Sequence, residues 1–157
     1  MTGGSTSHFP KIGTIMTALP EEARPLIEST ALGHVVTLNA DGSPHLTCVW
    51  IGWDEGDIVF ASSTLTKKIR NLIRDPRVAV SIESDRISEM GLKEYLWVRG
   101  SAVVTDGGGL GLLRGFAARY LGPGIPFQPG GDPRDGYRVR VKGERIGGLG
   151  PWIQAAR

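Results

Sequence analysis

Cysteine is almost absent from this sequence. The single residue, Cys48, excludes an intrachain disulfide and a cysteine metal cluster. The three histidines stand far from any second ligand at a zinc-like spacing, so we expect no metal site. The sequence also shows no nucleophilic triad and no paired carboxylates suited to acid–base work, so the catalytic residues stay unknown.

Net charge and long apolar runs are equally scarce. The net charge of +2 is too small for a general nucleic-acid binder. No apolar run is long enough to span a bilayer, and residues 1–11 lack the basic-then-apolar order of a signal peptide. We therefore expect a cytoplasmic protein that contacts neither nucleic acid nor membrane.

What is present is the composition of an ordinary globular domain. Hydrophobic residues make up 40% and charged residues 22% of the 157 positions, and a chain of this length is most simply one domain. Residues 1–16 are rich in Gly, Ser and Thr, which predicts a flexible N-terminal segment. The single domain is then assigned to residues 17–157.

Short apolar or alternating segments separated by turn residues predict about six strands, which favours an antiparallel barrel or sandwich in a mainly β (α+β) fold. The expected strands cover residues 34–38, 45–53, 58–62, 77–83, 95–105 and 137–142, and the expected helices cover 20–30, 66–74 and 110–120. Residues 84–93 are predicted to form a polar connection. Gly100 in the middle of a strand predicts a bulge or a close backbone approach.

The most informative stretch is a strand that leads into a short basic helix. The hydroxyl residues Ser62, Ser63 and Thr64 follow the apolar strand, and Lys67, Lys68, Arg70 and Asn71 follow in the first turns of the helix. A helix N-terminus carries partial positive charge and unpaired N–H donors, so hydroxyls and cations at this junction predict an anion site. A solvated basic helix face is the other interpretation of the same residues.

Together these residues resemble the pyridoxamine 5'-phosphate oxidase-like flavoprotein superfamily over residues 19–152. The resemblance rests on the strand pair around Asp41-Gly42-Ser43-Pro44, on the hydroxyl-to-basic-helix junction, and on Asp75-Pro76-Arg77-Val78 before an apolar strand. The pattern Lys-x-Arg-Asn-Leu-x-x-Asp-Pro-Arg-Val, here Lys68 to Val78, is similar to the F420-dependent flavin/deazaflavin oxidoreductases of type B. This resemblance implies a split β-barrel homodimer with the cofactor in a groove at the dimer interface.

The resemblance also implies roles for individual residues. Ser62, Ser63 and Thr64 would contact the ring edge or the phosphate-bearing chain, Lys67, Lys68 and Arg70 would hold phosphate or carboxylate, and Asn71 would donate a hydrogen bond nearby. Thr47, Val49 and Trp50 would line the ring, and Trp97, Arg99 and Trp152 would come from the second subunit. Core packing explains Trp50 equally, and a helix-surface amide explains Asn71.

The expected function is hydride transfer between coenzyme F420 and a small organic acceptor. One departure from the family pattern is Thr66, because an arginine often stands at this position; Lys67 replaces it only as a point charge. FMN, with a shorter phosphate tail, would also be satisfied by Lys67, Lys68 and Arg70. The alternatives are therefore an FMN-dependent oxidase or reductase of the same superfamily, and a cofactor-binding protein without turnover.

Overall fold

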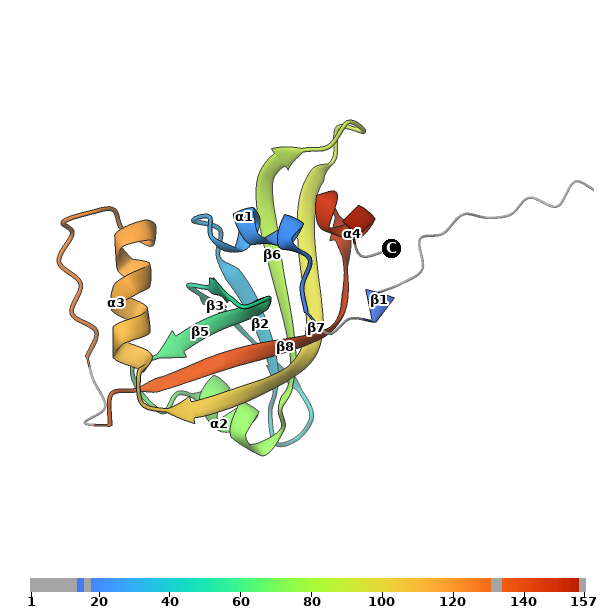
Figure 1. Cartoon of the computed structure of the whole chain (residues 1–157). Coiled ribbons are helices and arrows are strands. Elements are labelled where there is room, and N and C mark those ends of the chain that lie inside the picture. Colours follow the sequence, from blue (N-terminus) through green and yellow to red (C-terminus); the bar gives the residue numbers. More distant parts are fainter. Residues whose placement is uncertain (1–13, 16–17, 131–133, 156–157) are drawn as a thin grey trace, which may run out of the picture.

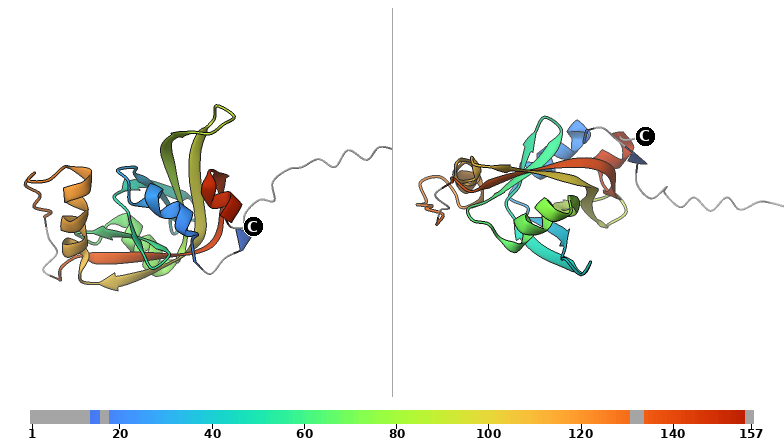
Figure 2. Two further views of the ribbon diagram at one scale, coloured as in Figure 1. Left: turned by 45° about the horizontal axis from the view of Figure 1, so that its top comes forward. Right: turned by 90° about the horizontal axis from the view of Figure 1, so that it is seen from below.

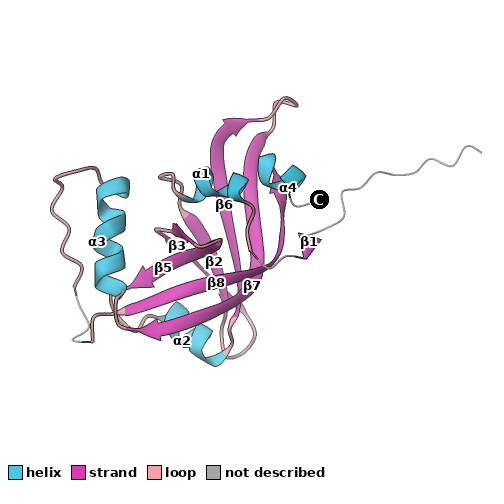
Figure 3. Ribbon diagram, in the orientation of Figure 1, coloured by secondary structure: helices cyan, strands magenta, loops and turns pink. Residues whose placement is uncertain are grey.

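The computed structural model describes residues 14–15, 18–130 and 134–155, which form one antiparallel sheet with short helices around it (Figure 1). Figure 3 shows that the strands make up the centre of the molecule and the helices its periphery. In chain order the elements are β1 (Thr14–Ile15), the 3-10 helix η1 (Glu21–Ala23), α1 (Arg24–Ile27), β2 (Gly33–Leu38), β3 (Pro44–Val49), β4 (Gly52–Asp54), β5 (Asp57–Ser62), α2 (Lys67–Arg74), β6 (Arg77–Ile87), β7 (Lys93–Asp106), α3 (Gly109–Tyr120), β8 (Tyr137–Leu149) and α4 (Pro151–Ala155).

The sheet runs in the order β3-β2-β6-β7-β8-β5-β4, and β1 pairs with β8 beside this path. Every neighbouring pair is antiparallel, which confirms the predicted antiparallel, mainly β architecture. Within the described residues β3 and β4 are not paired with each other, so the sheet is not closed. The long strands β7 and β8 run between α3 at one end of the molecule and α4 at the other (Figure 2).

The core lies on the concave side of the sheet, where alternate strand residues are buried. In β2 the burial alternates along Gly33–Leu38, with Val35 and Thr37 fully buried, as the period of two residues requires. Helix α2 closes one side of this core with Ile69 and Leu72, which are 0% and 2% exposed. The helix expected over residues 66–74 therefore covers the sheet with these two residues, whereas Ile73, which shares the apolar spacing, is 61% exposed and lies on the outward face of α2.

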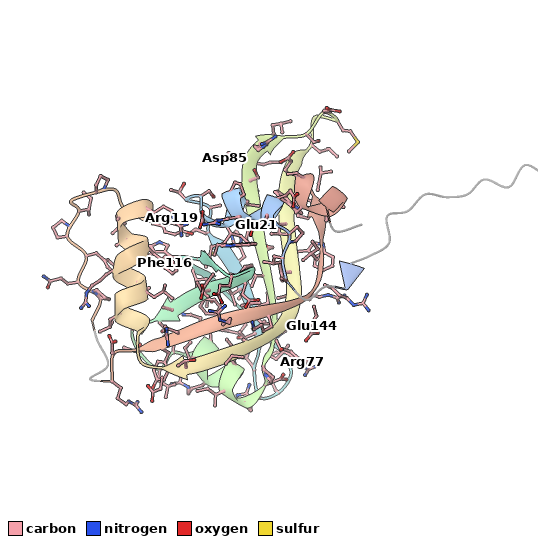
Figure 4. All side chains as sticks on the ribbon, in the orientation of Figure 1. Glu21, Arg77, Asp85, Phe116, Arg119 and Glu144 are labelled. Carbon is pink, nitrogen blue, oxygen red and sulfur yellow. The ribbon has the colours of Figure 1, made fainter. Side chains whose placement is uncertain are left out.

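The predicted strand 45–53 is wrong in its middle, because the chain leaves the ladder at Trp50 and Ile51. The backbone of Ile51 is satisfied by side chains of α3 instead: its N–H donates to Tyr120 Oη at 3.1 Å, and its carbonyl accepts from Arg119 Nη2. Figure 4 labels Arg119 and Phe116, which reach from α3 towards this part of the sheet. Strands β3 and β4 are therefore separate elements.

The polar connection predicted for residues 84–93 is strand at residues 84–87 and 93, and only residues 88–92 connect the two strands. Strands β6 and β7 continue as a protruding hairpin as far as Ile87 and from Lys93 onwards. Cross-strand ion pairs join Lys93 to Glu83 at 2.5 Å and Arg86 to Glu94 at 3.4 Å. The charged residues of this segment are thus compatible with strand structure, because they form ion pairs across the hairpin.

The bulge predicted at Gly100 is confirmed. The register of β7 on β8 shifts between Arg99, which opposes Arg145, and Gly100, which opposes Gly143. A Cβ atom at Gly100 would lie 1.8 Å from the carbonyl oxygen of Lys142, so only glycine fits there. The bulge leaves Glu144 as the extra residue of β8.

The N-terminal part of the chain is described only in pieces. The predicted flexible segment 1–16 lies outside the described residues except for Thr14–Ile15, which pair as β1 with Arg145 and Ile146 of β8. The predicted helix 20–30 is shorter, since η1 and α1 together end at Ile27.

Candidate functional site

At the junction between β5 and α2, the hydroxyl of Ser62 forms a hydrogen bond with the backbone two residues further along the chain. Ser62 is buried, and its Oγ donates to the carbonyl oxygen of Thr64 at 2.7 Å and lies 3.3 Å from Thr66 Oγ1. Thr66 is the extended N-cap residue of α2, but its side chain makes no capping hydrogen bond. The first N–H groups of α2 therefore have no side-chain acceptor, and Ser63 and Thr64 stand beside them.

The cations of α2 surround this uncapped helix start. Among the described residues, neither Lys67 nor Lys68 has a carboxylate within ion-pair distance. Lys68 is half-buried, and this desolvation lowers the pKa of its ammonium group. Arg70 Nη1 donates to the carbonyl oxygen of Leu65 at 2.8 Å, which holds its guanidinium beside the loop that enters α2.

An anion is the group that this arrangement accommodates best. Desolvating an ammonium without a partner costs free energy, and an anionic ligand at the same place offsets that cost. The helix dipole, the free N–H groups and the side-chain cations all act in the same direction. Ser62, in contrast, already uses its hydroxyl hydrogen within the chain.

Asn71 is buried at 3% exposure, which neither of the two sequence interpretations expected. Its Nδ2 donates to Thr37 Oγ1 and to Asn39 Oδ1, both at 3.0 Å, and its Oδ1 accepts from Arg74 Nη2 at 3.0 Å. Both amide hydrogens are thus engaged by the chain itself. Asn71 fixes α2 against β2, and its predicted contact with a cofactor would have to replace one of these bonds.

The C-terminal end of α2 is held by a second set of charges. Arg74 Nη2 donates to the carbonyl oxygen of Leu38 at 2.5 Å. Two guanidinium nitrogens of Arg77 donate to Asp75, with Nη2 to Oδ2 at 2.7 Å and Nε to Oδ1 at 3.1 Å. These hydrogen bonds lower the pKa of Asp75 to about 2. The Asp-Pro-Arg motif therefore serves first to end the helix and lead into β6.

The residues predicted to line the ring lie apart from one another. Thr47 and Val49 point to the concave side of β3; Val49 is buried, and Thr47 Oγ1 is a buried atom without a hydrogen-bond partner among the described residues. Trp50 stacks on Tyr120 with ring centroids 5.3 Å apart and contacts Phe127 at 5.0 Å. Trp50 is half-buried and lies outside the hydrophobic core, so it packs on these two rings and not in the core as the sequence interpretation suggested.

The opposite face of the sheet carries an open hollow, here called the sheet trough. It has two lobes of about 390 and 340 Å³ that share Val36, Ala79 and Arg99. Its lining residues come from five strands: His34, Val36, Leu38, Leu46, Arg77, Ala79, Ser81, Trp97, Arg99, Gly100, Glu144 and Arg145, together with backbone of Val78, Val80 and Val98. Figure 4 labels Arg77 and Glu144 at one end of it. Volumes of this size hold small ligands.

The structure brings the predicted residues together in two groups rather than one. The residues from Ser62 to Asn71 meet at the start of α2, and Trp97 and Arg99 meet in the sheet trough, where the Arg99 guanidinium lies 5.4 Å from the Trp97 ring. Leu38 and Arg77 line the trough beside the C-terminal end of α2, which is the end away from the first group.

Trp152 belongs to neither group. It is 2% exposed, and its indole N–H donates to the carbonyl oxygen of Tyr95 at 3.2 Å. The sequence reasoning missed Val36, Ala79 and Arg145 of the trough, although small Ala79 and Ser81 on one face of β6 were a signal of an open surface.

In the described part of the chain, no three side chains of the metal-ligating types His, Cys, Asp and Glu gather at one place. No described helix is both long and apolar enough to cross a membrane.

Comparison with known proteins gives the following matches. The family model described as pyridoxamine 5'-phosphate oxidase matches residues 19–146. A solved structure named F420 reductase is 28% identical, with a TM-score of 0.66 over 82% of this chain and 98% of that one. A conserved hypothetical protein from Mycobacterium tuberculosis is 22% identical, with a TM-score of 0.64 over 87% and 86%.

A heme binding protein from Mycobacterium smegmatis is 26% identical, with a TM-score of 0.58, and this chain spans about half of it, 53%. No curated protein matches significantly. The shared fold is the split β-barrel, and the proteins that carry it differ in what their names say they bind.

Proposed function

Because the chain belongs to the pyridoxamine 5'-phosphate oxidase family, we propose that it is an F420-dependent oxidoreductase that transfers a hydride between this cofactor and a small organic acceptor. The observation that carries the proposal is the start of α2, where the helix lacks a side-chain cap and where Lys67 and Lys68 have no carboxylate partner among the described residues. The similarity to a structure named F420 reductase supports the same choice of cofactor.

The residues at this junction fit the acidic part of the cofactor. Lys67 and Lys68 would hold its phosphate together with the free N–H groups of α2, and Arg70 would meet a second oxygen or a tail carboxylate. The hydroxyls of Ser63 and Thr64 would complete the contacts. When bound, reduced F420 supplies the hydride, and solvent supplies the proton that completes reduction of the acceptor.

The sheet trough would hold the cofactor ring and the acceptor. Its floor is apolar, with Val36, Ala79 and Leu46, and it is open to solvent in the single chain. A second copy of the chain packed on this face would exclude water and form the groove expected for a homodimer. Trp97 and Arg99 would then face the cofactor that the partner's α2 binds.

FMN is the runner-up, and it is favoured by position 66. Because residue 66 is a threonine, whose hydroxyl lies 3.3 Å from Ser62 Oγ, this position supplies no cation for a long acidic tail. A shorter phosphate-bearing cofactor needs only the cations that are present. A protein that binds either cofactor without turnover uses the same residues, so turnover has to be measured separately.

The test is a pair of calorimetric titrations of the protein, one with F420 and one with FMN, that measure the two dissociation constants. We expect F420 to bind more tightly, and Lys68→Gln to weaken it by about 10- to 100-fold, as loss of a charge-assisted contact does. The matched control is Lys93→Gln, because Lys93 forms only an exposed ion pair with Glu83. Preference for FMN would contradict the choice of F420, and equal affinities of the two variants would contradict the site.

A further inference from the structure

Two arginines stand directly opposite each other in the sheet trough. Arg99 of β7 and Arg145 of β8 are cross-strand partners, and residues paired in this way project from the same face of the sheet. Both line the same lobe of the trough. Like charges at directly opposite positions repel and lower the stability of a sheet.

No carboxylate of the described residues neutralises this pair. Neither guanidinium has an acidic group within 4.0 Å. Glu144 lines the same lobe without forming an ion pair to either arginine, and the nearby Arg77 is already bound to Asp75. The two charges are therefore available to an anion that arrives from outside.

The bulge at Gly100 creates this juxtaposition. Because Glu144 is the extra residue of β8, both Glu144 and Arg145 reach the trough, although neighbours in a regular strand point to opposite faces. Bulges commonly redirect side chains next to functional sites. The backbone thus departs from regular pairing at the point that brings Arg145 beside Arg99.

A flat aromatic surface adjoins the pair. Trp97 opposes Gly147 of β8, and a Cβ atom at Gly147 would lie 2.2 Å from Trp97 Cζ2, so the indole rests on the bare glycine backbone. Val36 and Ala79 continue the apolar surface beside it. The trough thus offers an apolar platform that adjoins the two cations, since the Arg99 guanidinium lies 5.4 Å from the centre of the Trp97 ring.

We propose that Arg99 and Arg145 bind the carboxylate of a planar conjugated molecule whose ring system lies on Trp97, and that this molecule is the hydride acceptor. That the bound molecule accepts a hydride rests on the proposed function, whereas its binding at this place rests on the trough alone. Guanidinium groups on cross-strand partners can both donate to one carboxylate, and an apolar platform selects a ring over an aliphatic chain.

The test uses 2-naphthoate as the probe and the uncharged 2-naphthamide as its matched partner, titrated into the full chain without cofactor by calorimetry. We expect naphthoate to bind at least about tenfold more tightly than the amide, because only the anion gains charge-assisted hydrogen bonds. Arg145→Gln and Arg99→Gln should each weaken naphthoate by about tenfold and leave the amide unchanged. Trp97→Leu should weaken both probes by about 3- to 10-fold, since both rings lose their platform.

Arg114→Gln is the matched control, because Arg114 is exposed on α3 outside the trough. Thermal unfolding of the variants without ligand adds a second readout: Arg145→Gln should raise the melting temperature by about one or two degrees, as it removes the repulsion. A structural role for Arg145 would lower the melting temperature instead.

Equal binding of naphthoate and the amide, or an effect of Arg145→Gln no larger than that of Arg114→Gln, would overturn the proposal. So would a wild-type dimer that Arg145→Gln dissociates while naphthoate does not bind, since the pair would then serve a second copy of the chain. Failure here with F420 binding intact would leave the proposed function standing, and the reverse result would leave the carboxylate site standing.

Discussion

Asn71 Nδ2 donates a hydrogen bond of 3.0 Å to Thr37 Oγ1, which joins the middle of α2 to a fully buried residue near the end of β2, 34 positions away in the chain. The same amide holds Asn39 and accepts from Arg74. An asparagine that the family pattern suggests as a ligand thus acts in the described structure as the support that fixes the basic helix. The position of Lys67 and Lys68 depends on it.

The first prediction concerns this support. Asn71→Ala should lower the free energy of unfolding by about 2–3 kcal/mol, because Thr37 Oγ1 is left buried and unpaired and Arg74 loses an acceptor. Thr37→Val should cost about 1 kcal/mol alone. Urea unfolding of both single variants and the double variant should give non-additive losses, as expected for contacting residues. Additive losses would mean that the bond contributes nothing.

A second prediction follows from the half-buried Lys68, whose pKa lies below its ordinary value of 10.5 because of desolvation. The unfolded chain then binds more protons than the folded chain in the window just below 10.5, so stability should rise as the pH rises through it. The penalty is fully present at neutral pH. Lys68→Met should therefore melt higher than wild type at pH 7, and this advantage should shrink near pH 10.5. A constant difference would contradict the desolvation.

The third prediction concerns the carboxyl group of Asp75, which is partly buried. Its carboxyl pKa is held at about 2 by the Arg77 fork, below the ordinary 3.8. The stabilisation is present above 3.8 and is lost as the pH falls towards 2. In Arg77→Gln the carboxyl pKa should return towards 3.8, which a side-chain NMR titration measures directly. An unchanged pKa would show that the fork is not formed in solution.

A fourth prediction tests the packing of the Trp97 indole on the backbone of Gly147. Gly147→Ala should displace the indole, since the new Cβ would lie 2.2 Å from it, and should cost about 1–3 kcal/mol as overpacking does. Near-UV circular dichroism should change with it. The control is Gly111→Ala in α3, where no atom lies within 4 Å and where a helical alanine should stabilise by about 0.5–1 kcal/mol. Identical spectra for Gly147→Ala and wild type would contradict the contact.

The local parts of the site could be predicted from the sequence, because they depend on neighbours in the chain. The strand, the hydroxyls and the helix from residue 66 to 74 follow one another, and the structure has α2 at Lys67–Arg74. The bulge was also predicted, since a glycine inside a strand is itself the signal. The sheet trough could not be predicted, because it depends on which strands become neighbours and on the register that sets Arg145 opposite Arg99.

The errors have the same physical origin. The strand predicted for 45–53 breaks because Arg119 and Tyr120, far along the chain, take the backbone groups of Ile51. Residues 84–93 looked like a polar loop because polarity within a sequence does not show that charges pair across a hairpin. In both places a long-range contact overrides local preference.

The most direct measurement of the central claim is an amide NMR titration of the isotope-labelled protein with F420. If the start of α2 binds the phosphate, the backbone amides of Lys67, Lys68 and Ile69 should show the largest chemical-shift changes, together with that of Thr64. In Lys68→Gln the same titration should reach saturation only at a higher F420 concentration. If F420 binds while these amides stay unchanged, the anion site at α2 is wrong.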